Sequence, residues 1–176
     1  MSHQLRNFSK SSIRCVSDIS TILKGLEKKL IYMDHHLSHT LTALTYSTIQ
    51  KDICSVVVDG FGDRSTASIS KVNSYFNIKE LWSCDYPASL GLFYSAITDY
   101  LGFAVNEGEY KMMGLASFGQ PKYYDILSKT VKFENNELIV DTKYYDYVRR
   151  TDRSYGDLLV KELKIKPRSP DIPFQV

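Results

Sequence analysis

One stretch in the first half of the chain constrains the fold more than any other. Residues 53–59 read ICSVVVD, a nearly continuous apolar run of the kind that forms a strand buried on both faces. The run leads into a tight turn, GFGDRS, and residues 66–72 (TASISKV) then alternate with the period of a returning strand. Residues 74–86 read as a further strand paired with it. The chain is therefore expected to contain a local antiparallel meander.

Segments with helical or strand-like patterns lie on both sides of this meander. The sequence predicts a helix over 17–29, a short buried strand over 30–33, a helix over 35–47, a helix beginning near Pro87 and Ser89, a short helix over 121–129 and a hairpin over 131–140 with Asn135 and Asn136 in its turn. This order predicts an α/β fold: a mixed sheet flanked by helices.

Composition narrows the class of protein. The chain has 176 residues and a net charge of +2, with Lys and Arg scattered along it, which suits one domain and does not favour a nucleic-acid partner. No apolar run approaches the ~20 residues of a membrane span. The residues Cys15, Cys54 and Cys84 lack CxxC spacing, and the amino terminus is polar, so neither a disulfide framework nor a signal peptide is indicated. A cytoplasmic location is expected.

A pair of histidines is the first candidate for chemistry. His35 and His39 are four positions apart on the helix expected at 35–47, so their side chains share one face. Asp59 follows the apolar strand, at the strand end where ligands gather in α/β proteins. Two histidines and one carboxylate are a typical set of metal ligands with open positions for substrate. The alternative is that the pair lies on the surface or only supports a site.

The second candidate stretch is residues 106–119, NEGEYKMMGLASFG. Its glycines let the backbone approach a ligand, free amides can cradle an anion, and Lys111 adds positive charge. The alternative is a helix amino terminus with Glu107 and Glu109 in the first turn and Gly119 as the stop. Residue chemistry alone favours the second reading, because the spacing matches neither a P-loop nor a dinucleotide-binding fingerprint.

Three motifs resemble those of the NodU/CmcH-type O-carbamoyltransferases. They are MDHHLSHTLTA, VVVDGFGDRSTASI and YPASLGLFYSAITDYLGFAVNEGEYKMMGLASFGQP, and they occur in the family's order over about residues 30–121. The resemblance implies an actin/Hsp70-like (ribonuclease H-like) nucleotide-binding fold in a Kae1-like domain. It also implies transfer of a carbamoyl group, from carbamoyl phosphate and ATP by way of carbamoyl-adenylate, to a hydroxyl of a sugar- or antibiotic-like small molecule.

The resemblance also assigns residues. It implies a divalent metal, expected to be iron, held by His35, His39 and Asp59, with Asp59 as the catalytic residue. We assign Gly60, Gly62 and Lys111 to binding the nucleotide cofactor, and Asp63, Glu107 and Glu109 to binding substrate. Asp63 stands where the family usually has Glu. His36 points off the face shared by the two ligands, and we expect it to pack or to support them.

The extent of the resemblance suggests a fragment. Residues 1–29 are expected to be a variable helical segment and 30–176 a partial Kae1-like domain. The family's first strands, a late metal-ligating Asp and a YrdC-like domain are not found in the chain, so a second chain or those missing parts are expected partners. The alternative is a non-catalytic relic that binds a metal or nucleotide. A related transferase acting on tRNA or on a hydrogenase-maturation protein is disfavoured by the SLGL and GEYKMMGLA strings.

Overall fold

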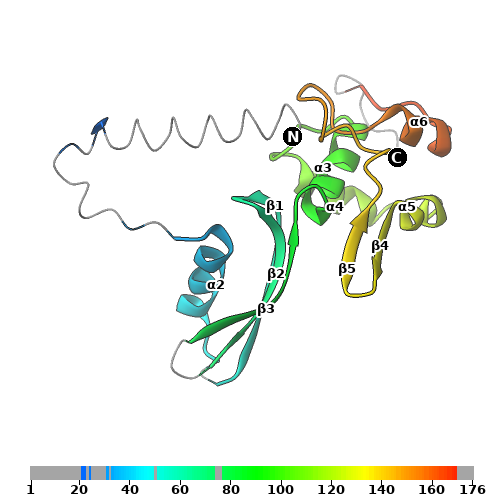
Figure 1. Ribbon diagram of the computed structural model, residues 1–176. Coiled ribbons are helices and arrows are strands. Elements are labelled where there is room, and N and C mark those ends of the chain that lie inside the picture. The colour runs from blue at the N-terminus through cyan, green and yellow to red at the C-terminus, as the bar shows by residue number, and fades with distance from the viewer. Residues whose placement is uncertain are drawn as a thin grey trace.

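The structure is a computed structural model, shown in Figure 1, and it describes residues 21–22, 24, 31, 33–49, 51–73 and 77–169. Most of the helix expected at 17–29 lies outside these residues. The described elements form two groups: a three-stranded sheet with one helix against it, and a cluster of short helices with a hairpin at the sheet's end. The mixture of helices and strands agrees with the expected α/β class, while the actin/Hsp70-like assignment and the division at residue 30 stay predictions.

The meander is confirmed. Its strands are β1 (Ile53–Gly62), β2 (Ser65–Val72) and β3 (Ile78–Asp85), in the order β1-β2-β3. All strand pairs among the described residues are antiparallel, so the expected mixed sheet is wrong for this part of the chain. Gly62 pairs with Ser65, which leaves a two-residue turn of Asp63 and Arg64 between β1 and β2.

The expectation that β1 is buried on both faces is wrong. Val57 is buried, with 8% of its surface exposed, but Val56 and Val58 are 62% and 55% exposed. Successive side chains of a strand point to opposite faces, and the described part of the chain covers only the face that carries Val57. A continuous apolar run does not reveal which of its two faces will be covered.

The expectation of a short buried strand at 30–33 is also wrong at the two of these residues that the structure describes. Ile31 and Met33 are in no strand, and they are 88% and 50% exposed. A strand needs the backbone groups of a neighbour, and in the described structure β1, β2 and β3 pair only with one another. A four-residue apolar run does not by itself supply that neighbour.

Helix α2 (His35–Tyr46) lies against the Val57 face of the sheet. Its buried residues are His36, Thr40 and Leu44, spaced four apart along one side of the helix. The interface is partly polar: Nδ1 of His36 lies 2.9 Å from Oγ of Ser68, and Oγ1 of Thr40 lies 2.9 Å from Oγ of Ser55. These side-chain hydrogen bonds set the rotation of α2 about its axis, and hence which residues it presents beyond the packed face.

The second group is built around α3 (Leu90–Tyr100) and has its own core. The remaining elements are α4 (Glu109–Ala116), α5 (Tyr124–Thr130), β4 (Val131–Glu134), β5 (Glu137–Val140) and α6 (Asp157–Leu163). The buried core comprises Ala96, Tyr100, Val140, Tyr145, Tyr147, Leu159 and Leu163. Buried tyrosines need partners for their hydroxyls, and that of Tyr147 donates to the carbonyl of Pro87 at 3.1 Å.

The helices and hairpin of this group mostly match expectation. Ser89 caps α3, and the hairpin turn at Asn135 and Asn136 is confirmed, with φ values of 53° and 63° that suit asparagine in a tight turn. Helix α6 was not expected. Its signals were Leu159 and Leu163 at helical spacing, with an acidic residue in the first turn and a basic one in the last.

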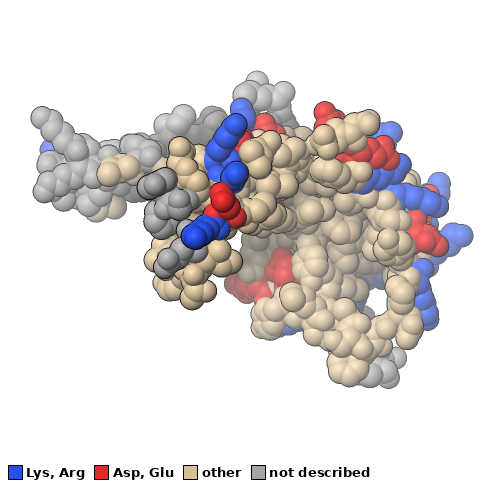
Figure 2. All heavy atoms as spheres, turned by 90° about the horizontal axis from the view of Figure 1, so that it is seen from below, with Lys and Arg blue, Asp and Glu red and all other residues tan. Residues whose placement is uncertain are grey.

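The distribution of charge and the character of the helices bear on possible partners. On the face shown in Figure 2, Lys and Arg side chains are interspersed with Asp and Glu. Among the described residues, no helix has both the length and the apolar character needed to cross a membrane.

Candidate metal centre

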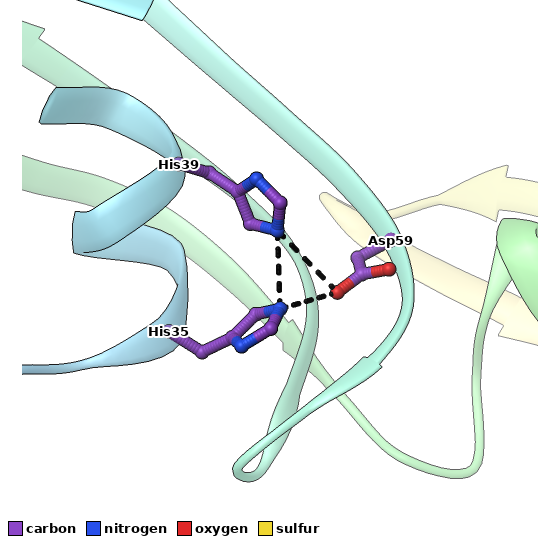
Figure 3. Close-up of side chains that lie close together, drawn as sticks. All are labelled: His35, His39 and Asp59. Atoms are coloured by element: carbon purple, nitrogen blue, oxygen red, sulfur yellow. Dashed lines mark hydrogen bonds and ion pairs between the residues drawn. The ribbon is translucent and has the colours of Figure 1, made fainter. Parts of the chain in front are cut away.

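Two histidines and one aspartate converge at the junction of α2 and β1. Figure 3 shows His35 and His39 extending from α2 toward Asp59 on β1. Nε2 of His35 lies 2.8 Å from Oδ2 of Asp59 and 3.1 Å from Nε2 of His39, and the His39–Asp59 distance is 3.8 Å. The predicted shared face and the predicted proximity of Asp59 are therefore confirmed.

The start of α2 fixes the two histidines. Asp34 is the N-cap, and its carboxylate accepts the N–H of Leu37 at 2.9 Å, so the helix begins at His35. His39 follows one turn later on the same side, and the two imidazole ring centres lie 4.7 Å apart. The helix start thus decides that His35 stands at the end of α2, beside the turn of the hairpin.

Asp59 is held by its own strand. The ladder between β1 and β2 is irregular between Val58 and Gly62, so Asp59 lies at a β-bulge within β1 and not at its end as the sequence suggested. Its Oδ1 accepts the N–H of Gly60 at 2.6 Å, which leaves Oδ2 directed at the histidines. A bulge re-aims a side chain in this way.

The three donor atoms fit a single metal ion. All lie within 4.8 Å of one another. Two ligands about 2.1 Å from one ion at roughly 90–110° are about 3.0–3.4 Å apart. The three distances in the cluster, 2.8, 3.1 and 3.8 Å, bracket this range. Two imidazoles and a carboxylate are a donor set suited to Fe²⁺ or Zn²⁺. The side chains of His35, His39 and Asp59 are 42%, 51% and 31% exposed, so further coordination positions face solvent.

The amino terminus of α3 supports the bulge from the other side. The Oγ of Ser89 donates to the carbonyl of Gly60 at 2.7 Å and lies 3.2 Å from that of Asp59, while it accepts the N–H of Leu92. A Cβ atom at Gly91 would lie 2.5 Å from the backbone oxygen of Asp59. Position 91 therefore requires glycine, because α3 packs directly on the peptide that carries the ligand.

A pocket of about 580 Å³ opens beside the cluster. Asp59 lines it and so belongs to both the metal centre and the pocket wall. The rest of the lining comes from the β1 bulge, the first turns of α3 and the start of α4: Val58, Gly60, Phe61, Leu90, Gly91, Leu92, Tyr94, Ser95, Asn106 and Glu109. Small molecules bind in concave sites of this size.

Glu109 faces this pocket, but its carboxylate is already well bonded. It accepts the Oγ–H of Ser95 at 3.1 Å and the N–H groups of Asn106 and Gly108 at 3.0 and 3.2 Å. Burial acts to raise the pKa of Glu109, and these hydrogen bonds outweigh it and lower the pKa below its ordinary value. Glu109 thus stays ionised and joins the start of α4 to α3.

Within the stretch 106–119, residues 109–116 form helix α4, so the second of the two readings is right about the helix, although Glu107 precedes it. Glu109 lies in the first turn of α4, but the helix ends at Ala116 and not at Gly119. Glu107 and Lys111 are exposed and do not line the pocket; the ammonium of Lys111 lies 5.8 Å from the ring centre of Tyr110.

Two further assigned residues contact the metal cluster from the hairpin turn. Oδ2 of Asp63 accepts the backbone N–H of His35 at 3.0 Å. Gly62 lies against the His35 ring, and a Cβ there would be 2.7 Å from Nε2. Of the residues assigned to cofactor or substrate, only Gly60 and Glu109 line the pocket.

His36 packs beneath the cluster, as expected. It is 4% exposed, and its Nδ1 bonds to Ser68. The roles of Gly91, Ser95 and Asn106, and the contact of Ser89 with β1, were not expected from the sequence. Ser89 and Gly91 belong to the SLGL string, which marks them as candidates. Their contact with β1 could not be predicted, because that strand lies 29 or more residues earlier in the chain.

Comparison with known proteins identifies a family and several relatives. The sequence model of the family described as "Carbamoyltransferase N-terminus" matches residues 5–156. The chain is 34% identical over 150 residues to the uncharacterized protein sll1178 of Synechocystis, covering 82% of this chain and 23% of that protein. It is 31% identical over 177 residues to the nodulation protein NolNO of Sinorhizobium fredii, covering 94% and 24%.

A third relative is the nodulation protein NolO of Bradyrhizobium diazoefficiens, 37% identical over 92 residues that cover 52% of this chain and 16% of that protein. The chain therefore spans about a quarter or less of the length of these curated relatives. The matched residues 5–156 include His35, His39, Asp59 and every residue that lines the pocket.

Proposed function

The chain belongs to the carbamoyltransferase family whose amino-terminal domain it matches, and we propose that it forms the metal-binding part of an O-carbamoyltransferase. The observation that carries this proposal is the placement of Asp59, which belongs both to the three-residue donor cluster and to the wall of the 580 Å³ pocket. A molecule in the pocket would lie beside an ion held by His35, His39 and Asp59.

The proposed reaction is an acyl transfer. The hydroxyl oxygen of a small-molecule acceptor forms a bond to the carbonyl carbon of carbamoyl-adenylate, and the bond from that carbon to the phosphate oxygen breaks. AMP leaves with the electron pair, and the hydroxyl proton passes to a base. The carbamoyl-adenylate itself derives from ATP and carbamoyl phosphate, which we propose as the substrates of the whole protein.

The chain's own residues would prepare this step in two ways. His35, His39 and Asp59 hold a divalent ion, which we propose to be iron and which supplies a positive charge for the oxygen atoms that gain negative charge during transfer. Glu109, Ser95 and Asn106 form a hydrogen-bonded group in the wall of the same pocket. This group orders the wall against which an acceptor hydroxyl would be placed.

A second function from the same residues is metal binding without turnover. Its support is the exposure of the donor side chains, 42%, 51% and 31% for His35, His39 and Asp59. Closed active sites exclude water during reaction, whereas these three side chains are open to it in the described structure.

One experiment tests both. Fe²⁺ is titrated anaerobically into the purified 176-residue chain and into the His39→Ala and Thr42→Ala variants, beside an assay for pyrophosphate release that depends on carbamoyl phosphate. Thr42 is on the same helix, and its hydroxyl donates to the carbonyl of Ser38 within α2, so its variant controls for changes in that helix. We expect one ion per chain in the control, and binding at least ~10-fold weaker without His39.

The two functions differ in the second assay. Pyrophosphate release that requires His39 supports the transferase. Metal binding without release is expected of the isolated chain under either function, because the chain spans only about a quarter of the length of its relatives. Equal Fe²⁺ affinity in the His39→Ala variant and the unmodified chain contradicts both.

A further inference from the structure

The turn between β1 and β2 contacts the first histidine of the cluster at two separate points. We propose that Asp63 is a positioning residue of the metal centre: its carboxylate holds the backbone of His35 and does not contact substrate. This inference rests on the proposed metal-binding function. The sequence assigned Asp63 to substrate binding, but its carboxylate is directed at the start of α2.

The first contact is with the backbone. The first N–H groups of a helix have no partner within the helix, and at α2 two carboxylates supply partners. Asp34 accepts the N–H of Leu37 from within the same segment, whereas Asp63 accepts the N–H of His35 from 28 residues away. Asp63 therefore attaches the helix to the hairpin at the residue that carries the first ligand.

The second contact is with the ring of His35. A Cβ at Gly62 would lie 2.5 Å from Cγ of His35 and 2.7 Å from its Nε2, so the ring lies directly on the backbone of the strand end. Because Asp63 holds the backbone of His35 and Gly62 bounds its ring, the imidazole is confined between them. Asp59, on the same strand, then faces Nε2 at 2.8 Å.

The turn is itself anchored to the end of β3 and the residue that follows it, so it can hold Asp63 in a fixed position. The guanidinium of Arg64 lies 3.0 Å from Oδ2 of Asp85, and the carbonyl of Arg64 accepts the N–H of Tyr86 at 3.1 Å. Asp63 has a φ of 53°, a left-handed conformation that aspartate adopts more readily than most residues. The carboxylate of Asp63 is thus held over α2 by a turn fixed to the end of β3.

The test uses three variants of the full chain and Co²⁺ as the probe, followed by calorimetry and by the visible absorption of bound cobalt. Asp63→Gly removes the carboxylate and suits the positive φ. Asp63→Asn keeps an oxygen that can accept the N–H of His35. Thr42→Ala is the control on the same helix, because the Thr42 hydroxyl donates to the carbonyl of Ser38 within α2.

We expect Asp63→Gly to bind Co²⁺ about 10–100-fold more weakly, with an altered absorption spectrum. Asp63→Asn and Thr42→Ala should stay within about 3-fold of the unmodified chain. If Asp63→Gly binds as the unmodified chain does, or if Thr42→Ala loses affinity equally, Asp63 has no specific positioning role. If the unmodified chain itself binds no Co²⁺, the proposed metal centre fails, and the inference with it.

Discussion

The imidazole ring of His35 lies against the backbone of Gly62, so closely that a Cβ atom at position 62 would be 2.7 Å from Nε2 of His35. The two residues are 27 positions apart in the chain and belong to different elements, α2 and β1. The glycine of the hairpin is therefore needed for the position of the histidine, and the sequence assignment of Gly62 to cofactor binding has a simpler structural explanation.

This relationship predicts a contrast between two glycines of the same strand. Gly62→Ala should displace the His35 ring and weaken Co²⁺ binding by at least ~10-fold, with a loss of about 1–3 kcal/mol in the free energy of unfolding from overpacking. Gly60→Ala is the matched control, because its Cβ would meet only Cδ2 of Leu92, at an ordinary 3.8 Å. Calorimetric titration and urea unfolding measure both effects. Equal metal affinity in the two variants would contradict the role given to Gly62.

A second prediction concerns the cap of α3. Ser89 is fully buried, accepts the N–H of Leu92 and donates to the carbonyl of Gly60. Ser89→Ala removes the cap and leaves the strand carbonyl with one donor fewer, so the free energy of unfolding should fall by about 1–3 kcal/mol. Ser117→Ala, at the exposed end of α4, should change it by less than about 0.5 kcal/mol. Chemical denaturation compares the two, and similar values for both would show that the Ser89 contacts carry little stability.

The third prediction is a pH dependence at Glu109. Hydrogen bonds lower its pKa from the ordinary 4.5. A carboxyl whose pKa is lowered by folding contributes stability at pH values above its unfolded pKa, and that contribution is lost as the pH falls through the folded pKa. Glu109→Gln should therefore be less stable than the unmodified chain at pH 7, by about 1–2 kcal/mol, and the difference should shrink below about pH 4. A difference that stays constant from pH 7 to pH 3 would contradict the ionised, hydrogen-bonded state.

The fourth prediction is a gain in stability. Gly114 lies within α4, and a Cβ there would meet no atom of the described residues within 4 Å. Alanine restricts the unfolded chain more than glycine and favours helix. Gly114→Ala should raise the free energy of unfolding by about 0.5–1 kcal/mol and leave Co²⁺ affinity unchanged. A loss of stability would show that position 114 packs against something outside the described contacts.

The local elements were predictable because their signals are local. The helix that carries His35 and His39, the β1–β2 hairpin and the capping serine at position 89 all follow from spacing and turn residues. Because the ligand pair lies on one helix, its shared face could be inferred without knowledge of the fold.

The remaining features depend on contacts between distant segments. The exposed Val56 and Val58 have the same apolar character as the buried Val57, and only the position of α2 distinguishes them. Likewise, the role of Asp63 depends on a helix start 28 residues earlier in the chain. Such roles depend on side-chain packing and strand register, which cannot be predicted from the sequence of a turn alone.

X-ray absorption by the chain loaded with one equivalent of Zn²⁺ directly tests whether His35, His39 and Asp59 bind a metal ion. Zn²⁺ generally binds nitrogen and oxygen ligands more tightly than Fe²⁺ does, so it reports on the donor set regardless of the native ion. We expect two imidazole nitrogens and a carboxylate oxygen at about 2.0–2.2 Å from the ion, with one imidazole lost in His39→Ala. A spectrum without imidazole scattering, or one that is identical in the His39→Ala variant, would contradict the metal centre at His35, His39 and Asp59.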